Sequence, residues 1–167
     1  MVKELTIRRT FDAPRELVFR AWTDPALVTK WWGPTDFTTP IAEIDGRQNG
    51  RFYIAMHGPK GTEFDVDMPM RGVYTIYDPP KKLVFTNEGI FDEHGDAQLS
   101  TICTVTFTEA GGKTEIVVHI TLEKVNPAAE AAWSGAEMGW NQMVDKLVDF
   151  LAANKTEMAG KSAVARK

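Results

Sequence analysis

The sequence predicts a single soluble α+β domain in which a long C-terminal helix packs against a curved antiparallel sheet around an apolar pocket. Three observations support this fold class. Apolar and polar residues alternate with the period of a strand over most of the chain up to about residue 122. Beyond residue 126 the apolar residues recur at helical spacing. The length of 167 residues and the 43% hydrophobic content suit one domain with a substantial core.

The first part of the chain is expected to hold one strand and two short helices. Residues 5–11 alternate between apolar and polar, as in a half-buried strand. Pro14 suits the first turn of a helix, and residues 14–22 place their apolar side chains on one helical face. The segment Thr23-Asp24-Pro25 predicts a break and a new cap. The second helix then ends at Gly33-Pro34.

The middle of the chain predicts a run of short strands joined by tight turns. Clusters of glycine, proline, asparagine and aspartate separate the apolar segments. The predicted strands span residues 37–44, 51–56, 64–77, 83–86, 100–108 and 113–122. Such a pattern is typical of an antiparallel meander with one covered face.

The last predicted element is a helix that opens at Asn126-Pro127. Its apolar stripe consists of Trp133, Ala136, Trp140, Met143, Val144, Leu147 and Leu151. A helix with so wide a stripe needs a broad apolar partner, which the inner face of the sheet provides. We therefore expect residues 1–154 to form the domain. Residues 155–167 lack the stripe and are expected to be a flexible tail.

Composition excludes several classes of function. The formal net charge of −4 argues against a nucleic-acid partner, since phosphate binding needs concentrated positive charge. No apolar run approaches the roughly 18 residues that a membrane span requires. The N-terminus lacks the apolar core of a signal peptide. A single cysteine, Cys103, excludes an internal disulfide and fits a reducing cytoplasm.

Strand parity predicts a pocket between the sheet and the helix. Side chains at alternate positions of the middle strands face inward, including Ile76 in the strand from 64 to 77. We expect the ligand-binding residues to be Trp31, Trp32, Phe52, Ile54, Met56, Met68, Met70, Tyr74, Phe85, Asn87, Thr101, Cys103, Ala136, Trp140 and Met143. Methionine adapts to varied apolar shapes, and Tyr74, Asn87, Thr101 and Trp140 carry polar groups that would orient a ligand. The alternative is that any of these residues simply fills the core.

Several segments together resemble a known family. They are Leu5–Pro14, Val18-Phe19, Ala21-Trp22, Asp24-Pro25, Trp31–Pro34, Asp45, Arg47, Gly50, Phe52, Gly72, Tyr74, Ile76, Pro79-Pro80, Leu83-Val84, Gly139-Trp140 and Leu147. From about Leu5 to Asn154 the chain is similar to homologues of the heat-shock ATPase activator, within the START-like or pollen-allergen-like superfamily. Asn49 departs from the pattern, because relatives often have a second glycine there.

The resemblance implies a helix-grip fold. This fold has a seven-stranded antiparallel sheet, two short helices after the first strand and a long closing helix. It also implies a cavity that binds lipids, polyketides or other apolar molecules in many relatives. The scaffold determines activity only weakly, because function depends on the site.

Catalytic candidates are few, and we predict no catalytic residue, metal or cofactor. His57, His94 and His119 are interpreted as surface histidines, and parity directs Asp65 and Asp67 outward. The acidic loop from Glu88 to Asp96 matches neither zinc nor calcium spacing. The sequence contains no glycine-rich phosphate motif and no serine nucleophile elbow.

Three functions follow from these observations. The leading hypothesis is non-catalytic binding of a small hydrophobic ligand, such as a lipid, polyketide or aromatic metabolite. The second is a cyclase or hydrolase acting in the same cavity. The third is an interaction protein that modulates a chaperone ATPase. Both a monomer and a homodimer are compatible with the sequence.

Overall fold

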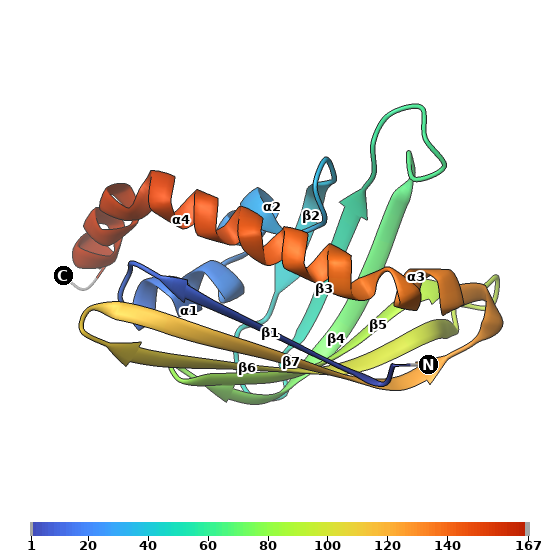
Figure 1. The fold of residues 1–167 in the computed structure, drawn as a ribbon, viewed down its shortest axis with the longest axis horizontal. Helices are drawn as coiled ribbons and strands as arrows, with labels where there is room; N and C mark the ends of the chain where they lie inside the picture. Colours follow the sequence, from blue (N-terminus) through green and yellow to red (C-terminus); the bar gives the residue numbers. More distant parts are fainter. Residues whose placement is uncertain (1, 166–167) are drawn as a thin grey trace.

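Seven antiparallel strands form one curved sheet around the last helix of the chain (Figure 1). The computed structural model describes the backbone of residues 2–165 and the side chains of residues 2–154. The strand order is β1-β7-β6-β5-β4-β3-β2, so β1 and β2 are the edges. This architecture confirms the predicted α+β helix-grip fold. In the described part of the chain, no helix is both long and apolar enough to cross a membrane.

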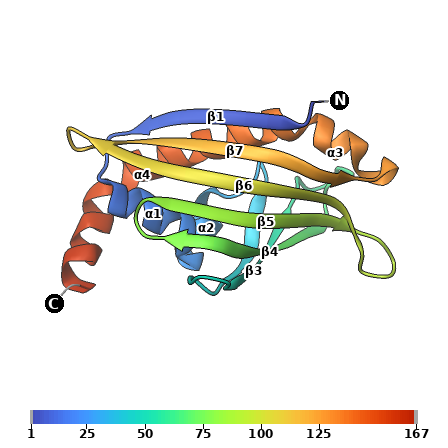
Figure 2. The ribbon, with the colours of Figure 1, turned by 90° about the horizontal axis from the view of Figure 1, so that it is seen from below.

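The elements follow the predicted order. They are β1 (Glu4–Phe11), α1 (Arg15–Thr23), α2 (Pro25–Trp31), β2 (Thr38–Ile44), β3 (Arg51–His57), β4 (Asp67–Asp78), β5 (Lys82–Phe91), β6 (Ala97–Ala110), β7 (Lys113–Val125), η1 (Pro127–Ala129), α3 (Glu130–Ser134) and α4 (Ala136–Ala165). Figure 2 shows β1, β7, β6, β5 and β4 side by side, with α4 behind them. The concave face of the sheet is thus the one that α4 covers.

The predicted closing helix is broken near its start. A 3-10 turn and the five-residue α3 precede α4, and Gly135 separates the two α-helices. Glycine is a poor helix former, so the break falls where the helix is weakest. The backbone of α4 continues through Ala165. The flexible tail expected over 155–167 stays a prediction, because it lies outside the residues whose side chains are described.

A β-bulge in β4 corrects one predicted inward residue. Tyr74 pairs with Phe85, whereas Ile76 pairs with Val84, so β4 contains one extra residue between these positions. The bulge turns Ile76 outward, where it is 39% exposed. Tyr77 faces inward instead, with its ring centroid 5.6 Å from that of Phe19. The strict alternation that placed Ile76 inside was therefore wrong for this residue.

The part of α4 from Val144 to Leu151 packs into a filled apolar core. Val144, Leu147 and Leu151 of α4 are almost fully buried. Polar contacts fix the helix to the edge strand β1. The Arg9 guanidinium donates to Asp145 Oδ1 at 2.9 Å and to Asn141 Oδ1 at 2.8 Å. The closing helix is therefore held by both apolar packing and these two hydrogen bonds from Arg9.

Gly72 in β4 leaves space for the aromatic ring of Phe52, which packs directly against it. The Phe52 ring from β3 lies directly over Gly72, and β5 approaches from the other side. A Cβ at this position would lie 2.5 Å from the Phe52 ring and would overlap the carbonyl oxygen of Thr86. The sheet therefore requires glycine here for close approach rather than for a turn.

Gly72→Ala is expected to lower the free energy of unfolding by roughly 1–3 kcal/mol, because the methyl group overpacks a rigid site. Gly89→Ala in the adjacent strand is the matched control, since nothing lies within 4 Å of its added Cβ. Urea denaturation followed by tryptophan fluorescence measures both. Equal stability of the two variants would contradict this packing of Phe52 against Gly72.

Candidate ligand-binding site

Two adjoining cavities lie between the start of the closing helix and strands β3 to β5. Their volumes are about 440 Å³ and about 290 Å³. Their walls share Met56, Met68, Met70, Asn87, Leu99 and Ala132. Met143 from α4 is a fourth methionine in the wall. We therefore call the two cavities together the methionine-walled cavity. The combined space suits a small organic ligand.

Small residues on the helices leave room on one side of this cavity. Ala132, Gly135, Ala136 and Gly139 all line it. Their spacing of three or four residues places them on one face of the helical segment. Trp140 and Met143 supply the larger side chains on the helical side. From Ala132 to Gly139 the helical residues that line the cavity thus contribute only backbone and methyl groups.

Diverging strands leave room on the other side. The last pair between β4 and β5 joins Met70 to Gly89. Beyond it, β4 pairs only with β3, and Phe91 of β5 pairs with Ala97 of β6. Ile90 adopts φ of 55°, an unusual conformation for a β-branched residue, at the point where the strands part. In Figure 1 the ends of β3 and β4 rise away from β5.

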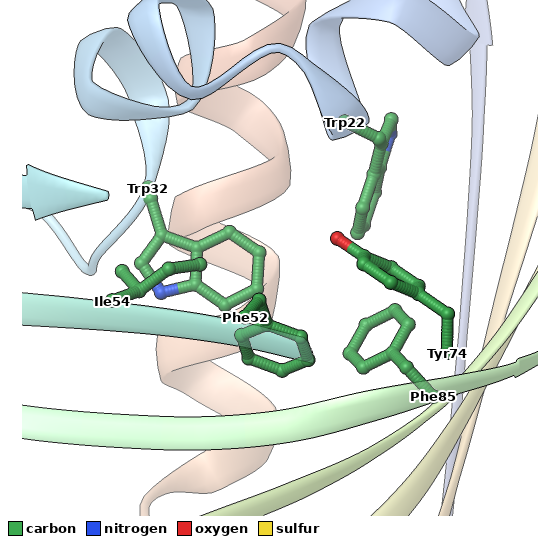
Figure 3. A pocket seen from close by; sticks show the side chains of 6 residues that line it. All are labelled: Trp22, Trp32, Phe52, Ile54, Tyr74 and Phe85. Carbon is green, nitrogen blue, oxygen red and sulfur yellow. The ribbon is translucent and has the colours of Figure 1, made fainter. Parts of the chain in front are cut away.

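The deeper half of the predicted pocket is packed core. Trp22, Trp32, Phe52, Ile54, Tyr74 and Phe85 surround a space of about 10 Å³ (Figure 3). Such a space holds at most about one water. The ring centroids of Phe52 and Tyr74 are 5.5 Å apart, and those of Phe52 and Phe85 are 5.6 Å apart. In Figure 3 the Tyr74 hydroxyl points toward the Trp22 ring. Burial raises the pKa of Tyr74 above its ordinary value.

The predicted site residues divide between the cavity and the core. Those that line the methionine-walled cavity are Trp32, Met56, Met68, Met70, Asn87, Ala136, Trp140 and Met143. Phe52, Ile54, Tyr74 and Phe85 form the core just described. Trp31 is fully buried and donates its indole N–H to the carbonyl of Ala21 at 2.9 Å. Thr101 and Cys103 are also buried, and burial raises the pKa of the Cys103 thiol to about 12.

Several lining residues were absent from the sequence-based set. They are Pro34, Phe37, Phe64, Asp67, Pro69, Gly89, Ile90, Phe91, Leu99, Ala132, Gly135 and Gly139. The regular spacing of small residues from Ala132 to Gly139 was a usable signal. Phe64 shares the parity of Met68 and Met70 in the predicted strand 64–77, but β4 begins only at Asp67, and Phe64 lies in the turn before it.

Asn87 places an uncharged amide in a wall that is largely apolar. Its side-chain oxygen has no hydrogen-bond partner among the described residues. The indole nitrogen of Trp32 likewise has none. Buried polar groups in proteins are normally paired, so these two atoms of the cavity wall are exceptions, as is the indole nitrogen of Trp22 in the packed core beside it.

An aspartate–histidine–aspartate cluster lies at the rim. His57 Nδ1 is 2.7 Å from Asp67 Oδ1, and His57 Nε2 is 2.8 Å from Asp65 Oδ1. Both ring nitrogens face carboxylates, so the geometry requires an imidazolium that donates two N–H bonds. The hydrogen bond with Asp67, then that with Asp65, raises the pKa of His57. The Gly61 N–H and His57 lower the pKa of Asp65.

This cluster fixes the turn that carries Phe64. The backbone N–H of Gly58 donates to the carbonyl of Phe64 at 2.8 Å. The Phe64 ring then lies 5.8 Å from that of Phe37, and both line the cavity. His94 and His119 lie elsewhere, beside Glu93 and Glu4 respectively.

Lys146 on α4 anchors the segment opposite. Its ammonium donates to the carbonyls of Gly33, Pro34 and Phe37 at 3.1, 3.3 and 3.2 Å. An ammonium has three N–H donors, so this contact uses all of them. Partial burial lowers the pKa of Lys146. The residues Pro34 and Phe37 of the cavity wall are thereby fixed to the closing helix.

Comparisons with known proteins bear on the family and the fold of this chain. Residues 12–152 match the model of the family described as Activator of Hsp90 ATPase homolog 1-like protein. This match confirms the resemblance found in the sequence. No curated protein matches the chain.

Solved structures show the same fold at low sequence identity. A protein from Arthrobacter aurescens is 24% identical with a TM-score of 0.75, over 90% of this chain and 86% of that one. A protein from Chromobacterium violaceum is 21% identical with a TM-score of 0.75, over 90% and 97%. An AHSA1 protein from Silicibacter pomeroyi is 20% identical with a TM-score of 0.73, over 90% and 99%. These likenesses establish the fold.

Asn87→Leu is expected to raise the free energy of unfolding by about 1 kcal/mol, because it removes a covered oxygen that lacks a partner. Glu88→Gln, one residue along the same strand, is the control. Its carboxylate lies 3.7 Å from Arg71 and does not line the cavity. Chemical denaturation of both variants checks the expectation, and marked destabilisation by Asn87→Leu would show that the amide is structurally paired.

The rim cluster is expected to make stability depend on pH. Because the pKa of His57 is raised, its contribution is fully present below the ordinary value of 6.5 and is lost as pH rises through the raised pKa. The lowered pKa of Asp65 means that its contribution is present above 3.8 and is lost as pH falls through the lowered pKa. The melting-temperature advantage over His57→Gln should therefore be largest near about pH 5 and shrink toward about pH 9.

His94→Gln serves as the control for this pH series, because His94 lies in the exposed turn after β5. Its melting temperature should follow that of the unmodified protein across the range. A constant difference between the protein and His57→Gln at every pH would rule out an imidazolium between the two carboxylates.

Proposed function

The chain belongs to the family of Activator of Hsp90 ATPase homolog 1-like proteins, and we propose that it binds a small apolar molecule without transforming it. The observation that supports this function is the methionine-walled cavity, whose two parts have volumes of about 440 Å³ and about 290 Å³. Both lie within or near the size range of small-molecule pockets. Binding would remove the apolar surface of the ligand from water.

The wall chemistry favours a binder of varied shapes. Four methionines, Met56, Met68, Met70 and Met143, contribute flexible thioether side chains. The aromatic rings of Trp32, Trp140, Phe37 and Phe64 supply rigid surface beside them. This combination accepts an apolar ligand by rearranging the methionines and not the backbone.

Non-catalytic binding is favoured by the scarcity of titratable groups. Among the described residues that line the two cavities, Asp67 is the only one with an ionisable carboxyl, imidazole, thiol or amine. Its Oδ1 is engaged by His57 at the rim. General acid–base chemistry needs a group positioned at the reacting atom, and the apolar wall supplies none.

A chaperone ATPase partner is the second candidate, and the family description is the observation that favours it. Such an interaction would use the outer surface of the domain. It would therefore be insensitive to substitutions inside the cavity, whereas ligand binding would not.

Filling the cavity tests the proposed function. Ala136→Phe places a ring in the space beneath α4, and we expect it to weaken binding of the neutral fluorescent probe N-phenyl-1-naphthylamine by about tenfold or more. Met138→Phe adds a ring on the solvent side of the same helix, where Met138 is 65% exposed, and should leave the affinity unchanged. Fluorescence titration measures both.

Native mass spectrometry of the purified protein, followed by denaturing extraction, identifies any molecule that it carries. Loss of that molecule in Ala136→Phe but not in Met138→Phe supports the proposal. Equal probe affinity in the two variants, with no extracted molecule in either, would overturn it.

A further inference from the structure

Charge and hydrogen bonding around the methionine-walled cavity narrow the class of ligand. We infer that the ligand is uncharged and carries a hydroxyl or carbonyl group that hydrogen-bonds to the Asn87 amide. This inference rests on the proposed function and adds the polarity and charge of the molecule that is bound.

Asn87 lies where the two cavities meet. It lines both, and on β5 it pairs with the inward-facing Thr101 of β6. Its oxygen has no partner among the described residues. An amide offers two donors and one acceptor, and a half turn of the group exchanges them with little change in shape. It can therefore meet a ligand carbonyl as donor or a ligand hydroxyl as acceptor.

An anionic ligand would find no free cation. None of the described lining residues is lysine or arginine. Lys146 contacts the backbone of Pro34 and Phe37 in the wall, but its three N–H groups already bind carbonyls. The His57 imidazolium at the rim has both N–H groups bound to Asp65 and Asp67. A carboxylate would therefore lose its hydration and gain only neutral donors such as the Asn87 amide, without an opposite charge to compensate it.

A cationic ligand would gain little. Asp67 is the one carboxylate in the described walls, and its side chain is 63% exposed at the rim. Attraction to an exposed carboxylate is weak, because water and salt screen it. The ammonium group would still lose its own hydration as it entered the apolar space. The wall therefore favours a ligand whose polar group is uncharged.

The volume sets the size of the molecule. The two parts of the cavity, about 440 Å³ and about 290 Å³, together accommodate roughly 24 non-hydrogen atoms at the density of a liquid. Bicyclic aromatic probes fit this limit and come in matched charge states. The test set is 2-naphthol, 2-methylnaphthalene, 2-naphthoate and 2-naphthylmethylammonium.

Isothermal titration calorimetry of the full chain near neutral pH measures all four affinities. We expect 2-naphthol to bind about tenfold or more tightly than 2-naphthoate or the ammonium compound, which both lose hydration. Asn87→Leu should lower the affinity for 2-naphthol by about 3- to 10-fold, because one hydrogen bond is lost. It should leave the affinity for 2-methylnaphthalene unchanged. Glu88→Gln, outside the cavity, should leave all four probes unchanged.

The outcomes separate this inference from the proposed function. If 2-methylnaphthalene and 2-naphthol bind equally and Asn87→Leu affects neither selectively, the cavity binds apolar molecules but the polar contact is wrong. If 2-naphthoate or the ammonium compound binds as tightly as 2-naphthol, the neutral class is wrong. If none of the four binds, the proposed function fails and the inference with it.

Discussion

The separation of β4 from β5 beyond Met70 and Gly89 determines where this domain can hold a ligand. Up to that pair β4 and β5 are joined, and the Phe52 ring of β3 and the Thr86 carbonyl of β5 meet at Gly72. Beyond it the strands follow different neighbours, and the sheet no longer offers one closed surface to the helix. A packed core needs facing side chains within van der Waals reach, which diverging strands do not provide.

The residues of α4 show the same division between cavity and packed core along the length of the helix. Toward its C-terminal half, Val144, Leu147 and Leu151 fill the space above the sheet. Around its start, alanine and glycine face the diverging strands and leave room. Two polar anchors keep this arrangement in place. Lys146 holds the Gly33–Phe37 segment, and the His57 imidazolium holds the turn that carries Phe64. Charged side chains thus fix the walls on both sides of the opening.

Local pattern predicted the α+β class and the order of the elements, because each strand and helix shows its own periodicity and the turns between them are explicit in the sequence. The family resemblance added the helix-grip fold. Strand parity and helical spacing directed the methionines, Asn87 and Trp140 toward the pocket, and these residues line the cavity; that they bind a ligand stays a prediction. Phe52 and Tyr74 share that parity, yet they fill the core, because packing over Gly72 is a three-dimensional property. The bulge at Ile76 and the parting of β4 from β5 likewise arise between strands, where a one-dimensional pattern carries little information.

The central claim is that an apolar ligand binds among the four methionines of the cavity, and ¹³C-methyl NMR of labelled methionine tests it most directly. Titration with 2-naphthol should shift the methyl signals of Met56, Met68, Met70 and Met143 together and to saturation. Met138, which is 65% exposed on the outer side of α4, is the internal control and should not move. Unchanged signals for the four cavity methionines, or an equal shift of Met138, would contradict the account.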